Sequence, residues 1–115
     1  EYFYRKLTSW KEEILKEAQE TLVHLQEESL QEPDIADRAS AETERSLELR
    51  TRDRQRKLVA KIDEALRRIE DGTYGYCEET GEPISLSRLD ARPIATLSIE
   101  AQERHERREK SYRDD

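Results

Sequence analysis

The placement of proline and glycine leaves two long segments of this chain free of helix breakers. All three prolines and all three glycines lie outside residues 2–31 and 38–70. Proline removes a backbone donor and glycine weakens a helix interior, so each of these segments can form one uninterrupted helix. The sequence therefore predicts a mainly α-helical protein built around two long helices.

Apolar residues in both segments recur at spacings of four and three, which is typical of a coiled-coil seam. The two sets are Phe3, Leu7, Trp10 and Ile14 in the first segment, and Leu58, Ile62, Ala65 and Ile69 in the second. The two sets are symmetric about Ala36: for every residue of the first set, a residue of the second set lies the same number of positions after Ala36 as the first lies before it. Leu25 and Leu47 form a further pair of this kind. An antiparallel hairpin that turns near Ala36 would bring every pair level. We therefore expect a coiled-coil hairpin over residues 1–71.

The turn of this hairpin is predicted at residues 31–39. Pro33 would end the first helix, and an Asp would cap the second. The seam weakens towards the turn, where Thr21 is expected opposite Thr51, and polar layers of this kind specify register at some cost in stability. Helices of about 28 residues would give a rod on the order of 40 Å long.

Charge is divided unequally between the two arms. Residues 12–34 hold eight acidic residues against one lysine, whereas residues 45–68 hold nine basic residues against four acidic ones. The simplest interpretation is solvated faces that also attract one another across the hairpin. The net charge of -7 argues against a protein that coats DNA or RNA. We expect no sequence-specific DNA binding of its own.

A smaller module is expected over residues 72–115. Residues 74–84 indicate a short hairpin around a glycine turn, and Ser98 is a suitable N-cap for a final helix over about 99–112. Apolar packing would hold the module together. The expected set is Tyr74, Tyr76, Ile84, Leu86, Leu89, Ile94, Leu97 and Ile99.

The sequence offers little catalytic chemistry, and we expect a protein that is not an enzyme. It has no glycine-rich phosphate loop and no cluster of metal ligands, and His24 and His105 lie far apart. Because Cys77 is the single cysteine, the sequence excludes an internal disulfide and indicates a reducing compartment, and we expect the thiol to be inert.

No apolar run approaches a membrane span, so we expect a cytoplasmic protein without a membrane partner. Because the sequence lacks Met, we also expect a truncated or processed piece.

The two acids of the predicted turn, Asp34 and Asp37, admit two interpretations. An Asp at the start of a helix accepts hydrogen bonds from free amides and interacts favourably with the helix dipole, which is a structural role. Two carboxylates at the end of a rod could instead act inside a deep cleft of a partner. The residues alone leave both interpretations open.

Four segments together resemble the DksA/TraR type of bacterial RNA polymerase-binding transcription factors, the DksA family. They are the tip Asp34-Ile-Ala-Asp37-Arg-Ala39, the helical segment 47–58 (LELRTRDRQRKL), the element Tyr74-Gly-Tyr-Cys77 and the segment 88–96 (RLDARPIAT). The match extends over nearly the whole chain in one order. The tip string is weak by itself, but its position at the symmetry centre of a predicted hairpin makes the combination specific.

The resemblance implies a hairpin that enters the secondary channel of RNA polymerase and a globular module that rests on its rim. Asp34, Asp37 and Ala39 would act at the tip, near the polymerase active centre, and would alter the stability of promoter complexes. Ribosomal RNA promoters would be inhibited and some biosynthetic promoters activated, as in the stringent response.

The resemblance also implies that the alarmone ppGpp binds between the factor and polymerase. The matching positions are Arg54, Leu58, Lys61 and Arg92, and the chemistry is consistent because Arg and Lys pair with phosphates while Leu can pack beside a nucleotide. The alternative for Arg54 and Lys61 is pairing with acids of the first arm. Gln102 departs from the family, which often has a lysine there, so one phosphate contact is expected to be weaker.

The zinc site of the family is a second departure. It usually consists of two C-x-x-C pairs that supply four thiolates. The corresponding positions here are Cys77, Thr80, Ser98 and Ala101. From this donor set we expect a zinc-finger-like module that lacks zinc, with ppGpp as an effector and no other cofactor.

Two other classes of function stay open. A Gre-like factor would use an acidic tip to help polymerase cleave backtracked RNA, whereas a structural coiled-coil adaptor would leave transcription unchanged. Because the hairpin satisfies its own seam, we expect a monomer.

Overall fold

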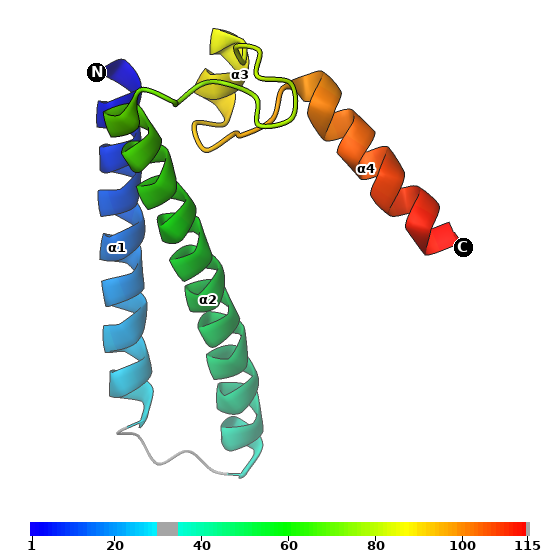
Figure 1. The fold of residues 1–115 in the computed structure, drawn as a ribbon. Coiled ribbons are helices and arrows are strands. Elements are labelled where there is room, and N and C mark those ends of the chain that lie inside the picture. The colour runs from blue at the N-terminus through cyan, green and yellow to red at the C-terminus, as the bar shows by residue number, and fades with distance from the viewer. Residues whose placement is uncertain (30–34, 115) are drawn as a thin grey trace. The chain divides into compact units, whose positions relative to one another are not determined.

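The computed structural model describes residues 1–29 and 35–114, and the regular elements of this part of the chain are helices (Figure 1). Helix α1 spans Tyr2–Ser29, α2 spans Ile35–Asp71, α3 spans Leu86–Ala91 and α4 spans Ile99–Asp114. The predicted mainly α-helical fold is confirmed. Helix α2 begins earlier than expected, so Asp37 lies inside its first turn.

The described chain forms two compact units. One contains Thr8–Ile62, and the other combines Glu1–Leu7 with Asp63–Asp115. The base of the hairpin thus groups with the C-terminal module. The expected division of the chain between residues 71 and 72 stays a prediction.

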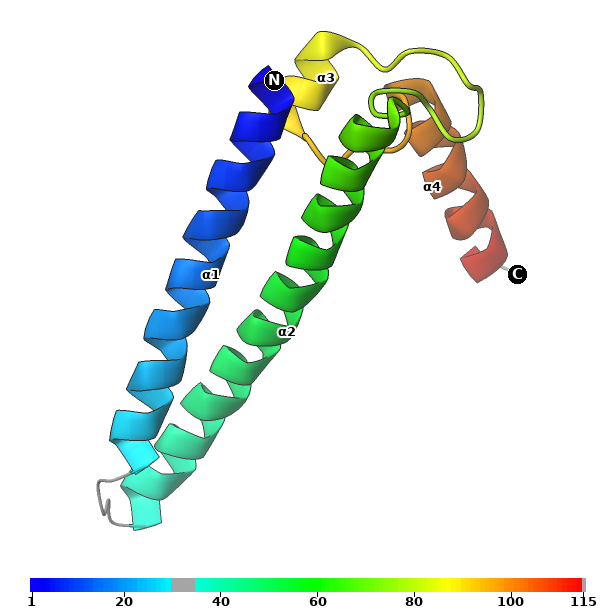
Figure 2. The same cartoon turned by 60° about the vertical axis from the view of Figure 1, so that its left-hand side comes forward.

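Helices α1 and α2 lie side by side and run in opposite directions, as two views show (Figures 1 and 2). In the unit Thr8–Ile62, Nε2 of His24 lies 3.6 Å from Oε1 of Glu48, and these residues are equally distant from Ala36. Ile14 and Ile62 are buried in the same unit. The predicted antiparallel coiled-coil hairpin and its register are therefore confirmed.

Apolar packing in the seam declines towards the turn. Leu47 was expected in the seam but is 55% exposed, so this expectation is wrong, and the side chain of Leu25 lies outside the described residues. The hydroxyls of Thr21 and Thr51 donate to carbonyl oxygens four residues earlier in their own helices, those of Glu17 and Leu47, at 3.0 Å in both cases. Because each hydroxyl is satisfied within its own helix, the polar layer needs no bond across the seam.

The core of the other unit combines the base of the hairpin with the module. Leu7 and Ala65 are fully buried, and Phe3 packs against the module's core cluster. This cluster consists of Cys77, Ile84, Leu89, Ala95 and Ala101, with Tyr74 and Leu97 packed against it.

Part of the expected module core is wrong. Tyr76, Leu86 and Ile99 are exposed, Leu86 to 73%. Small side chains, above all those of Ala95 and Ala101, occupy the interior instead. The module therefore closes around compact residues, and several of its large apolar side chains remain at the surface.

Backbone hydrogen bonds define the rest of the module. An isolated antiparallel bridge pairs Tyr76 with Pro83, and the Cys77 amide donates to the Glu82 carbonyl at 2.8 Å, which confirms the short hairpin. The short helix α3 was not expected. Its N-cap is Ser85, whose hydroxyl oxygen accepts a hydrogen bond from a backbone amide of the helix. Ser98 caps α4 as predicted, since its Oγ accepts from the Ala101 amide at 3.2 Å.

Candidate functional site

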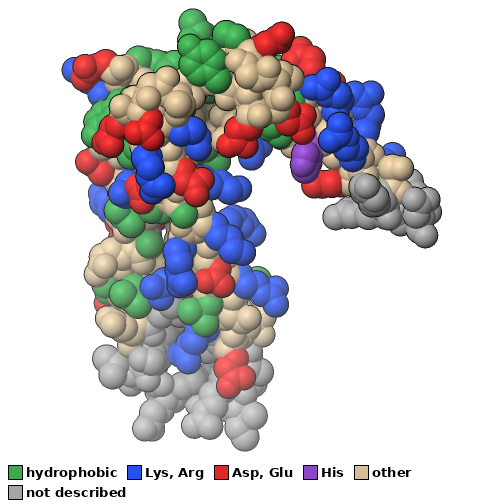
Figure 3. Space-filling view, in the orientation of Figure 1, with side chains coloured by type: hydrophobic (Ala, Val, Ile, Leu, Met, Phe, Trp, Pro, Cys, Tyr) green, Lys and Arg blue, Asp and Glu red, His purple; other side chains and the backbone are tan. Residues whose placement is uncertain are grey.

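Four cationic side chains form a basic stripe on α2. They recur at spacings of four, three and four residues, which places them on one face of the helix. The stripe consists of Arg50, Arg54, Lys57 and Lys61, all exposed. Figure 3 shows Lys and Arg side chains gathered along α2. Arg50 and Lys57 were not singled out from the sequence, although the helical spacing would have found them.

The expected ppGpp residues of α2 belong to this stripe or lie beside it. Arg54 and Lys61 are exposed, and Leu58 between them is half-buried. Among the side chains that the structure describes, neither cation forms an ion pair with α1, whereas Arg56 pairs with Asp53 of its own helix at 3.6 Å. Pairing across the arms therefore does not account for Arg54 and Lys61, and both charges are available to an anion.

Arg92 follows α3 in the other unit, so the four expected ppGpp residues are divided between the two units. The backbone amide of Arg92 donates to the Arg88 carbonyl at 2.8 Å, and its side chain is exposed. The next residue, Pro93, accepts a hydrogen bond from the Tyr74 hydroxyl at 2.7 Å. Burial raises the pKa of Tyr74 to about 12, so this hydroxyl remains a donor at neutral pH.

A long-range cluster that the sequence analysis missed holds the end of α3. The Nζ of Lys6 lies 2.7 Å from both Oδ1 and the backbone carbonyl of Asp90, and the Tyr2 hydroxyl donates to the same Oδ1. Mainly through their hydrogen bond, the pKa of Lys6 is raised and that of Asp90 is lowered, so both stay charged at neutral pH. Lys6 and Asp90 are 84 positions apart, and no local pattern signals their contact.

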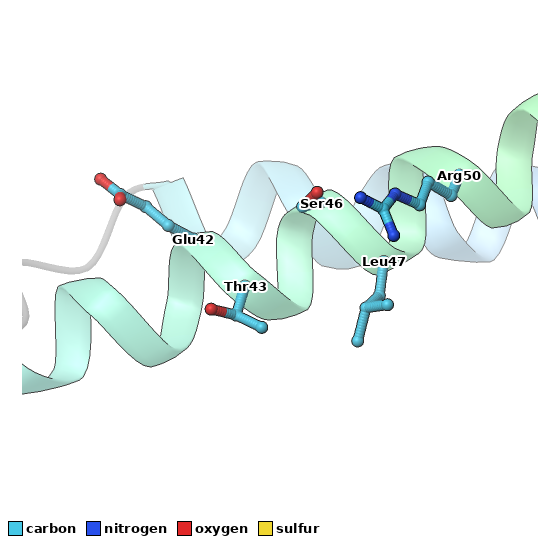
Figure 4. A pocket seen from close by; sticks show the side chains of 5 residues that line it. All are labelled: Glu42, Thr43, Ser46, Leu47 and Arg50. Carbon is cyan, nitrogen blue, oxygen red and sulfur yellow. The ribbon is translucent and has the colours of Figure 1, made fainter.

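The side chains of the tip residues expected to act on polymerase are not among those that the structure describes. Asp34 is outside the described residues, and Asp37 and Ala39 lie in α2 with side chains that are not described. An open groove of about 480 Å³ lies further along α2 (Figure 4). It is lined by Glu42, Thr43, Ser46, Leu47 and Arg50. Four of the five lining residues are polar or charged, and the exposed Leu47 is the apolar one.

Gln102, the expected weak point of the ppGpp site, lies in the first turns of α4. Its Nε2 donates to Oε1 of Glu106 one turn later at 3.1 Å. A neutral amide that is already bonded to a carboxylate is a poor partner for a phosphate. The expected loss of one phosphate interaction stays a prediction.

Of the positions that correspond to the family's zinc ligands, Cys77 and Ala101 belong to the module's core cluster, and Thr80 and Ser98 form hydrogen bonds with Cys77. Cys77 is 2% exposed. Hydrogen bonds from Thr80, and then from Ser98, lower the pKa of the Cys77 thiol to about 6. Ala101 contributes a fully buried methyl group. Within the described ranges, no group of three or more His, Cys, Asp and Glu side chains is arranged to hold a metal ion.

Comparisons with known proteins cover both parts of the chain. Residues 1–69 match the family model for the DnaK suppressor protein DksA, N-terminal domain, and residues 72–107 match that for the prokaryotic dksA/traR C4-type zinc finger. A helical hairpin followed by a zinc-finger type of module defines a class of bacterial transcription factor.

Relatives identify the family within that class. The RNA polymerase-binding transcription factor DksA of Caulobacter vibrioides is 71% identical over 115 residues, which is all of this chain and 81% of that protein. The Escherichia coli K12 protein of the same name is 46% identical over 109 residues, 95% of this chain and 72% of that protein. The structure of transcription factor DksA2 from Pseudomonas aeruginosa is 43% identical, with a TM-score of 0.89 over 95% of this chain and 84% of that one. The chain belongs to the DksA family of transcription factors.

The expectation of a module without zinc is wrong. Residues 72–107 match the C4-type zinc-finger model, and this match indicates zinc binding. That expectation rested on counting thiols at four positions. These positions supply one thiol, two hydroxyls and a methyl group, which do not fit a four-thiolate centre.

Among the helices in the described ranges, none is long and apolar enough to cross a membrane.

Proposed function

We propose that this protein binds RNA polymerase through its secondary channel and regulates transcription by altering the stability of promoter complexes. The observation that carries the proposal is the antiparallel α1–α2 hairpin, in a chain 71% identical to the RNA polymerase-binding transcription factor DksA of Caulobacter vibrioides. An α1 of 28 residues extends for about 40 Å at about 1.5 Å per residue. A rod of that length can carry a side chain deep into a channel.

The tip would supply the acting groups. Asp34 and Asp37 would bring negative charge near the polymerase active centre, and Ala39 would complete the tip. In a confined channel with little water, a carboxylate interacts more strongly with nearby cations than it does in bulk solvent. The protein would then act by electrostatics and position, as a regulator that is not an enzyme.

The effector would be ppGpp. Arg54, Lys61 and Arg92 would pair with its phosphates, and Leu58 would pack beside the nucleotide. The exposed cations of the basic stripe support this assignment, because none of them forms an ion pair with another described side chain and so none must first break one. Arg50 and Lys57 would extend the positive field along the same face.

The remaining expectations follow from polymerase as the partner. The protein would work as a monomer in the bacterial cytoplasm and make no sequence-specific contact with promoter DNA. Ribosomal RNA promoters would be repressed and some biosynthetic promoters activated, because promoter complexes differ in their intrinsic stability.

The test is transcription in vitro from a ribosomal RNA promoter with the cognate polymerase, with and without ppGpp. Asp37→Asn removes the charge but keeps a residue that can cap a helix, so it should fold normally and lose inhibition. Glu42→Gln, a charge change further along α2, is the matched control and should retain inhibition. If Asp37→Asn inhibits transcription as strongly as the parent protein, the role of Asp37 is helix capping. Cleavage of backtracked RNA, without an effect on promoters, would replace the proposal with a Gre-like function.

A further inference from the structure

The backbone around Arg92 is anchored on both sides. Before it, Asp90 is held twice by Lys6, at 2.7 Å through both its carboxylate and its carbonyl oxygen, and again by the Tyr2 hydroxyl. After it, the Pro93 carbonyl accepts the 2.7 Å hydrogen bond from Tyr74. The segment that presents Arg92 therefore lies between two fixed points.

Aromatic packing joins the two anchors. The rings of Tyr2 and Phe3 meet edge to face with centroids 4.9 Å apart, and the centroids of Phe3 and Tyr74 are 5.7 Å apart. The Nζ of Lys6 lies 5.7 Å from the centroid of the Tyr2 ring, within the range of a cation–π contact. Phe3 also packs against the module's core cluster. The start of α1 and the end of α3 are thus parts of one packed assembly.

The side chain of Arg92 takes no part in this assembly. Its backbone amide is bonded to the Arg88 carbonyl, but among the described side chains no carboxylate pairs with its exposed guanidinium. The position of the charge is therefore set through the backbone. The charge itself remains free to meet an anion.

We propose that Tyr2 and Lys6 are positioning residues for Arg92: by holding Asp90, they fix the end of α3 and so determine where the Arg92 guanidinium meets a phosphate-bearing effector. This inference rests on the proposed function, in which Arg92 contacts ppGpp. A guanidinium pairs with phosphate through parallel N–H donors in a fixed fork, so its interaction depends on orientation as well as on charge. A freely moving end of α3 would lose that orientation without losing the charge.

The experiment compares Lys6→Met with Arg5→Met. The first removes the ammonium group that binds Asp90 and keeps an unbranched apolar stem. The second makes the same substitution at the neighbouring residue, whose highly exposed side chain pairs with Glu1 at 3.2 Å. Lys6→Arg retains a cation and serves as the rescue variant.

Two measurements are made on each protein. The first is the ppGpp concentration that gives half-maximal inhibition of cognate RNA polymerase at a ribosomal RNA promoter. The second is hydrogen–deuterium exchange over residues 86–92 in the free protein, which does not depend on polymerase or ppGpp.

For Lys6→Met we expect the half-maximal ppGpp concentration to rise on the order of threefold to tenfold. The rise is moderate because the exposed contact between Lys6 and Asp90 orients Arg92 but does not itself touch ppGpp. Exchange over residues 86–92 should accelerate, and inhibition in the absence of ppGpp should match the parent. Arg5→Met should behave as the parent in all three respects, and Lys6→Arg should recover most of the ppGpp response.

An unchanged ppGpp response in Lys6→Met would overturn the positioning role, even if exchange accelerates. Equal losses of basal inhibition and ppGpp response would also overturn it, since they would assign Lys6 to general stability. Arg92→Ala separates this inference from the proposed function. If Arg92→Ala weakens the ppGpp response and Lys6→Met does not, the positioning role alone fails. If Arg92→Ala responds as the parent does, the effector assignment fails and the positioning role fails with it.

Discussion

Replacing Ile62 with Ala tests whether the buried part of the seam stabilises the hairpin. The Ile62 side chain is fully buried, and its truncation removes apolar contacts and leaves a cavity, which costs about 2–5 kcal/mol in protein cores. A seam between two helices can relax from its solvent side, so we expect the lower part of this range, about 2–3 kcal/mol. With an unfolding entropy of about 2.1 cal/mol/K per residue, a chain of 115 residues should lose roughly 8–12 °C in Tm.

Thermal unfolding followed by far-UV circular dichroism measures this loss directly. Leu47→Ala is the matched control, because Leu47 occupies an expected seam position but is 55% exposed. It should change the free energy of unfolding by less than about 0.5 kcal/mol. A loss of Tm in Leu47→Ala as large as in Ile62→Ala would refute the reasoning, since the seam would then be packed as tightly near the turn as at its base.

Two further predictions concern the module. Gly72 has a φ of +76°, and a Cβ there would meet nothing within 4 Å. Gly72→Ala should therefore lower the free energy of unfolding by about 1–2 kcal/mol through backbone strain alone. Urea unfolding of Gly72→Ala that matches the parent would contradict a strain at this position. Hydrogen bonds lower the pKa of Cys77 to about 6, below the value of about 8.5 for an unfolded thiol, so the unfolded state binds more protons between these values. The free energy of unfolding should therefore rise from about pH 6 to about pH 8.5. Urea unfolding across this range should show a flatter profile for Cys77→Ser, and identical profiles would exclude Cys77 as the cause.

The hairpin was predictable because its signal is periodic. The heptad spacing selected one face of each helix, and symmetry about Ala36 fixed the register that the contact between His24 and Glu48 confirms. The burial of Leu7 and Ala65 agrees with the same register. Leu47 is exposed where the seam becomes polar, close to Thr21 and Thr51, whose hydroxyls bond to their own backbones.

The module was less predictable because its short segments have no period. Hydrophobicity alone favoured Leu86 and Ile99 as core residues, whereas the close packing of the interior selects Ala95 and Ala101. Helix α3 has six residues, too few for a periodic pattern, and its N-cap Ser85 was the one available sign.

The candidate sites also differ in how far the sequence predicts them. The family resemblance supplied Arg54, Leu58 and Lys61, and their spacings of four and three residues place them on one side of α2. The contact between Lys6 and Asp90 depends on how distant segments fold together, and no spacing in a single sequence encodes it.

The place of Phe3 in the module core has a consequence for how the chain is made. Phe3 leaves the ribosome well before the residues of the core cluster against which it packs. The α1–α2 hairpin joins neighbouring helices through a short connection, so it can form before the module has emerged. Once formed, it holds the N-terminal residues beside residues 63–71, in the unit where the module will fold. The module then folds onto a surface that is already in place, so Phe3 and the core cluster need not find one another across a long flexible loop.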